Sequence, residues 1–230
     1  MKSTLHAMGS SLYDMTKHLT LMPIRRGIRV LRGKRFRLQE DGEREAEFYD
    51  EVFRHEDEYN VHYTQSRYYY VWCVLVDRIM SSGAKSVLDI GCGPGQLASF
   101  FRDRGLPKYF GLDLSPVAIE KARALCPGYQ FRAENALETK VLSQVDYDTV
   151  ISLEFLEHVH EELGVLEQIR SGTRFLGTVP DFPYQSHVRH FNSCQQVESR
   201  YGHLFNSFSV TEFVDPSRKK RYFLLDGIRK

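Results

Sequence analysis

The chain has 230 residues, of which 42% are hydrophobic and 27% are charged, and its formal net charge is +1. These values are those of an ordinary globular protein and exclude a disordered or fibrous chain. A nearly neutral chain has no whole-molecule field that would indicate a nucleic-acid partner. The length suits one main domain with a modest appendage, so we look for one main site.

Cysteine spacing and hydropathy give expectations about location. The four cysteines lack the C-x-x-C spacing of a zinc site or a redox pair, which predicts reduced structural thiols. The strongest apolar run, residues 71–76, is too short to cross a bilayer, and no basic segment followed by a long apolar one opens the chain. We therefore expect a soluble, cytoplasmic protein with no membrane span.

Residues 1–45 form a basic N-terminal arm, with a run of cations that contains no acid. The cations are Arg25, Arg26, Arg29, Arg32, Lys34, Arg35 and Arg37. Two interpretations stay open, a solvated arm and a segment that faces an anion. Residues 46–82 are rich in aromatic side chains and fit two helices.

From residue 83 to the end of the chain, short β-branched runs alternate with amphipathic segments, which predicts an α/β fold with a mostly parallel, doubly wound sheet. The expected strands lie near residues 86–90, 109–112, 129–133, 147–152 and 174–179, and the expected helices near 96–104, 116–125, 155–170 and 193–202. Two further strands, near 205–214 and 220–228, flank the turn sequence Asp215-Pro216-Ser217. They predict a C-terminal antiparallel hairpin.

A glycine-rich turn follows the first buried strand directly. Val87-Leu88-Asp89-Ile90 leads into Gly91-Cys92-Gly93-Pro94-Gly95 and then into a helical segment. Glycine permits a tight turn and lets a ligand lie against the backbone because no Cβ blocks its approach. The spacing is G-x-G-x-G, whereas a dinucleotide site usually has G-x-G-x-x-G, so the turn predicts another kind of ligand.

An acid stands at the end of the next strand. Asp113 is placed beside the glycine turn, where its carboxylate can accept hydrogen bonds from both hydroxyls of a ribose. The same residue precedes Ser115-Pro116 and can equally cap the helix that follows.

Together, residues 87–95, 111–115, 133–136 and 147–152 resemble class I S-adenosylmethionine-dependent methyltransferases over roughly residues 84–180. The resemblance implies a Rossmann-like seven-stranded sheet in residues 83–230, a helical lid over the substrate pocket in residues 46–82, and S-adenosylmethionine as cofactor with S-adenosylhomocysteine as product. Where the family commonly has Asp at the adenine position, this chain has Asn135, whose oxygen can still accept a hydrogen bond. The cofactor residues implied are Asp89, Gly91, Cys92, Gly93, Gly95, Asp113, Leu114, Asn135, Ala136 and Leu153.

The segment after the fourth strand carries an E-x-x-E-H pattern made by Glu154, Glu157 and His158. It resembles the metal-binding segment of ubiquinone-biosynthesis O-methyltransferases and of small-RNA 2′-O-methyltransferases, which implies a divalent metal. The alternative is a helix start whose acids are favoured by the helix dipole alone.

The loop after the fifth strand holds further candidates. His187, like His158, is a candidate catalytic base because imidazole titrates near neutrality, and Arg189 is a candidate for holding an acidic acceptor group. The alternative is that the histidines of this loop only satisfy backbone groups. By resemblance, Tyr59, Tyr63 and Arg67 are candidate lid residues.

These observations favour an enzyme that transfers a methyl group to an oxygen or nitrogen of a small-molecule acceptor, such as a sugar, a lipid-linked compound or a secondary metabolite. One alternative is an RNA methyltransferase that uses the basic arm to hold phosphates. Another is a non-catalytic module that keeps the cofactor pocket, since a fold does not guarantee activity.

Overall fold

A computed structural model describes residues 30–31, 34–35, 42–215 and 220–230. The chain divides into two compact units, residues 1–36 and 37–230. In the first unit, β1 (Val30–Leu31) pairs antiparallel with β2 (Lys34–Arg35). Of the basic run, only Lys34 and Arg35 lie within the described residues, and their side chains are not described. The turn residues Pro216 and Ser217 also lie outside the described residues. The role of the arm therefore stays a prediction.

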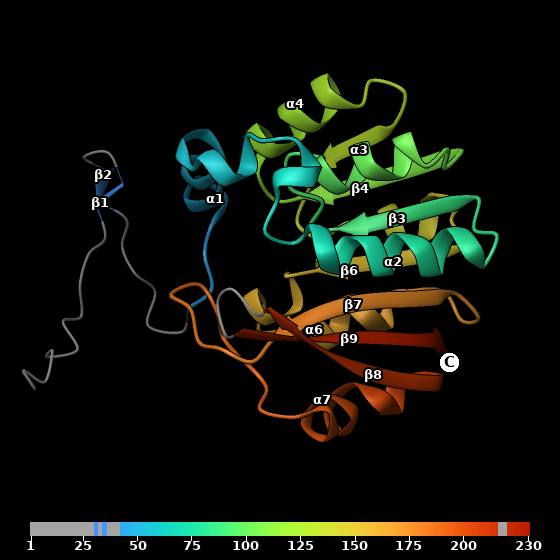
Figure 1. Ribbon diagram of the computed structural model, residues 1–230. Coiled ribbons are helices and arrows are strands. Elements are labelled where there is room, and N and C mark those ends of the chain that lie inside the picture. The colour runs from blue at the N-terminus through green and yellow to red at the C-terminus, as the bar shows by residue number, and fades with distance from the viewer. Residues whose placement is uncertain (1–29, 32–33, 36–41, 216–219) are drawn as a thin grey trace, which may run out of the picture. The chain divides into compact units, whose positions relative to one another are not determined.

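The second unit is built on a seven-stranded sheet with the order β5-β4-β3-β6-β7-β9-β8 (Figure 1). Its strands are β3 (Ser86–Ile90), β4 (Lys108–Asp113), β5 (Gln130–Ala133), β6 (Thr149–Leu153), β7 (Arg174–Pro180), β8 (Phe205–Asp215) and β9 (Lys220–Arg229). Strands β3 to β7 run parallel, and β9 runs antiparallel to both β7 and β8. The predicted fold class and the C-terminal hairpin are confirmed.

Helices cover both faces of this sheet because neighbouring strand residues point to opposite faces. Leu88 and Val150 belong to one buried core together with α5, α6 and α7, whereas Val87 and Ile151 belong to a second core with α2, α3 and α4. The helices are α1 (Ala46–His55), α2 (Tyr69–Ser81), α3 (Gln96–Asp103), α4 (Pro116–Leu125), α5 (Val141–Gln144), α6 (Glu162–Glu167) and α7 (Cys194–Tyr201).

The single helix predicted over residues 155–170 is wrong. The segment contains a short 3-10 helix, η3 (Leu156–His158), then an extended residue, Val159, and only then α6. The guanidinium of Arg189 binds the carbonyl oxygens of Leu156, Val159 and His160. Those carbonyls would accept amide hydrogen bonds if an α-helix continued, so a distant side chain replaces the helical partners.

The strand order reverses between β3 and β6, so the loops that leave these two strands diverge at their carboxyl ends. A crevice forms at such a reversal, and ligands of open α/β sheets bind there.

The segment before β3 contains the helices α1 and α2 and, between them, two 3-10 turns, η1 (Asp57–Tyr59) and η2 (Tyr63–Gln65). Among the described residues, no helix combines the length and the apolar character that crossing a membrane requires.

Candidate active site

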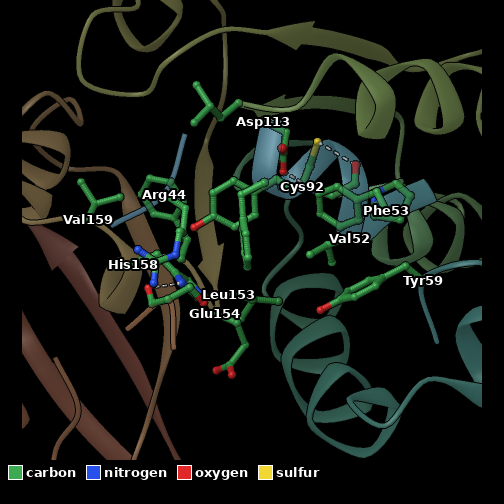
Figure 2. A pocket seen from close by; sticks show the side chains of 18 of the residues that line it. Arg44, Val52, Phe53, Tyr59, Cys92, Asp113, Leu153, Glu154, His158 and Val159 are labelled. Carbon is green, nitrogen blue, oxygen red and sulfur yellow. Dashed lines mark hydrogen bonds between the residues drawn. The ribbon is translucent and has the colours of Figure 1, made fainter. Parts of the chain in front are cut away.

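A cavity of about 470 Å³ lies at the carboxyl ends of β3, β4 and β6 (Figure 2). One end is lined by the strand ends and by the glycine turn, and the other by the segments that follow β6 and β7 and by the start of β9. Of the cofactor residues that the sequence implied, the cavity is lined by Asp89, Gly91, Cys92, Gly93, Asp113, Leu114, Asn135, Ala136 and Leu153.

The glycine turn is held against β4 by its own backbone. The amides of Gly91 and Cys92 both donate to the carbonyl of Leu112, at 2.7 and 3.0 Å. Gly91 has φ +82° and Gly93 has φ +52°, in the left-handed region that favours glycine. A Cβ on Gly91 would lie 3.0 Å from Phe155, so this position is also closed by packing.

Gly95 is not among the residues that line the cavity, so its contact with the cofactor stays a prediction. It has φ +84° and stands at the start of α3, where an added Cβ would lie 2.9 Å from both Cα and Cβ of Ala122 in α4. The third glycine of the motif therefore serves the close packing of two helices.

Asp113 joins the turn to the next helix. One carboxylate oxygen accepts from the amide of Gly93 at 2.8 Å, and the other accepts from the amide of Ser115 at 2.9 Å. The cap of α4 is Ser115, whose hydroxyl accepts from the amide of Ala118 at 3.0 Å. Burial raises the pKa of Asp113 to about 6. The backbone of Leu114 also hydrogen-bonds this carboxylate. A carboxylate offers about four acceptor sites, so acceptor capacity remains for a ribose hydroxyl.

Two further polar side chains near the glycine turn, those of Asp89 and Asn135, already accept hydrogen bonds from the protein. The hydroxyl of Tyr109 donates to the buried carboxylate of Asp89, whose pKa burial raises to about 7. The side-chain oxygen of Asn135 accepts from the amide of Leu137 at 3.0 Å, which leaves one lone pair for a ligand donor.

Helix α1 covers the cavity and is tied to α4. The hydroxyl of Ser115 donates to Asp50, and the amine of Lys121 donates to the carbonyl of Phe53 at 2.6 Å. Of the candidate lid residues, Tyr59 and Arg67 line the cavity. Tyr63 does not, because its ring stacks on Phe100 with 4.7 Å between ring centroids.

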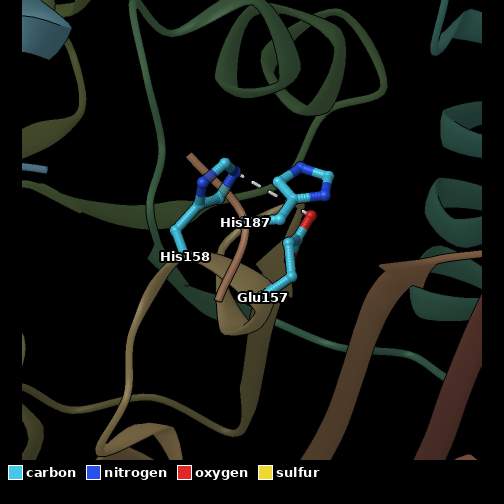
Figure 3. Close-up of side chains that lie close together, drawn as sticks. All are labelled: Glu157, His158 and His187. Carbon is cyan, nitrogen blue, oxygen red and sulfur yellow. Dashed lines mark ion pairs between the residues drawn. The ribbon is translucent and has the colours of Figure 1, made fainter. Parts of the chain in front are cut away.

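A cluster of Glu157, His158 and His187 lies where the segments after β6 and β7 meet (Figure 3). One ligand atom from each lies within 4.8 Å of the others. Glu157 is fully buried, and neither of its carboxylate oxygens has a hydrogen-bond partner among the described residues. The Nδ1 atoms of His158 and His187 lie 2.8 and 3.1 Å from the carbonyl oxygens of Ser186 and Phe182. Nε2 of His158 lies 3.9 Å from Oε1 of Glu157, which is beyond hydrogen-bond distance, so both rings keep Nε2 for a metal ion.

The electrostatics of the cluster favour neutral rings. Burial lowers the pKa of His158 to about 3 and the pKa of His187 to about 4. Burial also raises the pKa of Glu157 well above its usual value, and the nearby carboxylate of Glu154 acts in the same direction. Neutral imidazole is the form that binds a metal.

Glu154 is not part of this cluster. The predicted metal-ligand set was Glu154, Glu157 and His158, and in the structure His187 stands in place of Glu154. Glu154 has φ +54° and accepts from the hydroxyl of Thr178 at 3.0 Å. It lines the cavity, and Figure 2 shows its side chain extending away from His158. Burial raises its pKa to about 7.

Arg189 does not line the cavity, so the predicted contact with an acidic acceptor group finds no support. Its guanidinium is turned instead toward backbone carbonyls around η3 and toward Glu162, at 2.7 Å.

Sequence reasoning missed an aromatic wall at the end of the cavity away from the glycine turn. The ring of Tyr222 meets Tyr68 and Phe182 edge-on, with ring centroids 6.0 and 5.7 Å apart, and the amine of Lys220 lies 3.7 Å from the ring centroid of Phe182. Tyr68 directly precedes α2, Phe182 lies in the loop after β7, and Lys220 and Tyr222 belong to β9. No local motif marks these residues.

Comparison with known proteins decides the family. Residues 63–215 match the family described as methyltransferase domain. The chain belongs to this family. A ubiquinone biosynthesis O-methyltransferase from Aeromonas salmonicida is 33% identical over 99 residues, which cover 41% of this chain and 41% of that protein. The aligned part thus spans about two fifths of the length of this relative.

Solved structures agree on the fold. The N-methyltransferase NodS from Bradyrhizobium japonicum, in complex with S-adenosylhomocysteine, superposes with a TM-score of 0.64 and 12% identity over 80% of this methyltransferase-domain chain and 97% of NodS. The magnesium protoporphyrin IX methyltransferase ChlM from Synechocystis, also with S-adenosylhomocysteine, superposes with a TM-score of 0.59 and 17% identity. The superposition covers 80% of this chain and 99% of ChlM. The class I methyltransferase fold is confirmed, and the predicted cofactor, S-adenosylmethionine, agrees with the family.

Proposed function

We propose that the protein transfers the methyl group of S-adenosylmethionine to a hydroxyl oxygen of a small, planar acceptor. The observation that carries the proposal is one continuous cavity that joins the glycine turn and Asp113 to the end where Glu154, His158 and His187 stand. The names of the O-methyltransferase relatives support oxygen as the acceptor atom. The aromatic wall supports a flat acceptor, since rings stack on flat partners.

At the cofactor end, bare backbone at Gly91 and Gly93 would receive the amino-acid part of the cofactor. Asp113 would accept the ribose hydroxyls, Asn135 would face the adenine, and Leu153 would lie near the sulfonium. All five of these residues line the cavity, which supports the proposal.

The reaction is an in-line displacement in which the acceptor oxygen bonds to the methyl carbon while the carbon–sulfur bond breaks. The sulfonium becomes a neutral thioether and the hydroxyl proton passes to a base or to water. An enzyme contributes mainly by alignment and by excluding water. Helix α1 and the aromatic wall, which close over the cavity, are suited to both tasks.

A divalent cation fits the cluster of Glu157, His158 and His187. A fully buried carboxylate without a hydrogen-bond donor is costly unless a cation compensates it, and two neutral imidazoles complete a set of nitrogen and oxygen ligands. When bound, such an ion lowers the pKa of a coordinated acceptor hydroxyl. Histidines whose pKa lies near 3 to 4 are weak bases, so we favour the ligand role over the general-base role.

The proposal is tested by S-adenosylhomocysteine release with catechol as probe and resorcinol as its matched control. Adjacent hydroxyls can bind one cation together, whereas the 1,3-diol cannot, so catechol should turn over at least about tenfold faster. A chelator should suppress the reaction, and Glu157→Gln should reproduce that loss while S-adenosylhomocysteine still binds. Full turnover in the presence of chelator would remove the cation from the proposal.

The same assay addresses the two other readings. Turnover of an RNA oligonucleotide that disappears at high salt and on deletion of residues 1–40 would favour a nucleic-acid acceptor. Cofactor binding without transfer to any probe would favour a non-catalytic module.

A further inference from the structure

We infer that Arg189 is a positioning residue that holds Glu157 and His158 in place against His187. The inference rests on the proposed function only where a cation is used as a probe. It concerns two segments that leave different strands, β6 and β7, and that must meet with the right spacing for the cluster to exist.

The contacts of Arg189 surround the residues that it would position. Its guanidinium donates to the carbonyl oxygens of Leu156 and Val159, which stand on either side of Glu157 and His158. It also donates to the carbonyl of His160 at 2.9 Å and pairs with the fully buried carboxylate of Glu162 at 2.7 Å. The side chain is 14% exposed, so these contacts form in a largely dry environment.

The residues that precede Arg189 also bond the loop after β7 to η3. The amide of Val188 donates to the carbonyl of Glu157 at 2.8 Å, and Nδ1 of His158 lies 2.8 Å from the carbonyl of Ser186. His187 thus stands between two points at which its own loop is bonded to η3. Arg189 adds the third point and fixes the distance between His187 and the other two members of the cluster.

The chemistry of the contacts explains why arginine is used here. Guanidinium offers five donors in a rigid plane, so it can satisfy several carbonyls and a carboxylate together, whereas lysine offers a single point charge. The carbonyls at the end of η3 have lost their helical partners and need donors. Glu162 does not depend on Arg189 alone, because Arg200 also donates to it at 2.5 Å.

The experiment compares Arg189→Lys with Arg200→Gln in the full chain. Both variants weaken an ion pair with Glu162, but only the first removes donors from the carbonyls around η3. Residues that orient metal ligands typically change metal affinity by tenfold or more when replaced. We expect Arg189→Lys to weaken Mn²⁺ binding by about tenfold and to change the visible spectrum of bound Co²⁺. Arg200→Gln should keep both readouts of the wild type, and both variants should bind S-adenosylhomocysteine within about twofold.

A second readout needs no metal. Nitrogen-15 NMR of the imidazoles reports which ring nitrogen carries the proton, and Ser186 fixes that choice for His158. We expect the His158 and His187 signals to shift in Arg189→Lys and to stay in place in Arg200→Gln. If the two variants behave alike in this spectrum, the inference is overturned. If wild-type protein binds no Mn²⁺, the cation of the proposed function fails, and the spectrum alone still decides the role of Arg189.

Discussion

The two ends of the cavity are built in different ways. The cofactor end uses consecutive backbone of the glycine turn and one carboxylate from the neighbouring strand, Asp113. The other end, which we propose receives the acceptor and call the acceptor end, uses side chains from α2, η3, the loop after β7 and the start of β9. A ligand shared by a whole family can be held by a short local motif, whereas a particular acceptor needs groups that only the tertiary fold assembles.

The largest expected effect tests whether bare backbone makes the cofactor end. Gly93→Val should weaken S-adenosylmethionine binding at least about 100-fold, because the branched side chain enters the cavity beside Phe53. Calorimetric titration measures the affinity. Gly105→Val is the matched control, since Gly105 has a similar positive φ, +79°, and open space around it. Equal affinity in the two variants would show that the turn does not seat the ligand.

Most of the residues that the sequence marked for the cofactor line one cavity, because the features that mark them are local. The order of strand, glycine turn, helix and Asp113 is visible within residues 87–113, and parallel strands bring their carboxyl ends to one edge. The exception is Gly95: its conformation follows from the motif, but its neighbour Ala122 is set by helix packing.

The acceptor end was predicted only in part because its contacts are long-range. The spacing of Glu157 and His158 was visible, but the replacement of Glu154 by His187 depends on how the loop after β7 returns to η3. The long helix expected over residues 155–170 does not form for the same reason. Arg189 donates to the carbonyl oxygens of this segment from 29 to 33 residues further along the chain. Tyr222 and Lys220 reach the cavity only through the antiparallel hairpin.

A second substitution separates packing from ligand binding inside the glycine motif. Gly95→Ala should lower the free energy of unfolding by roughly 3 kcal/mol, because its Cβ would overlap Ala122 and the residue has a positive φ. Urea unfolding measures this loss, and Gly105→Ala gives the cost of the positive φ alone. The folded fraction of Gly95→Ala should bind S-adenosylmethionine within about threefold of wild type. A loss of affinity without a loss of stability would assign Gly95 to the cofactor site instead.

The smallest effect concerns the buried carboxylate of the cofactor end, Asp89, and is read as a dependence on pH. Its pKa is about 7 in the folded protein and 3.8 in the reference state, so between these values the folded chain holds a proton that the unfolded chain lacks. Binding this proton stabilises the folded state, so the free energy of unfolding of the wild type falls as pH rises toward 7. Asp89→Asn has no such group, so its stability relative to wild type should increase by about 2 kcal/mol from pH 5 to pH 7.

Urea unfolding of both proteins at the two pH values measures the effect of Asp89 as a double difference. His158 and His187 titrate in the opposite sense, since their depressed pKa values cost stability as pH falls below 6.5, but they are present in both proteins and cancel. The side chain of Asn can still accept from Tyr109, so the substitution removes the charge and keeps the hydrogen bond. A difference that is flat with pH would mean that Asp89 is ionised when folded. The cofactor end would then contain a buried negative charge that the fold stabilises, and backbone alone would not account for how this end of the cavity is built.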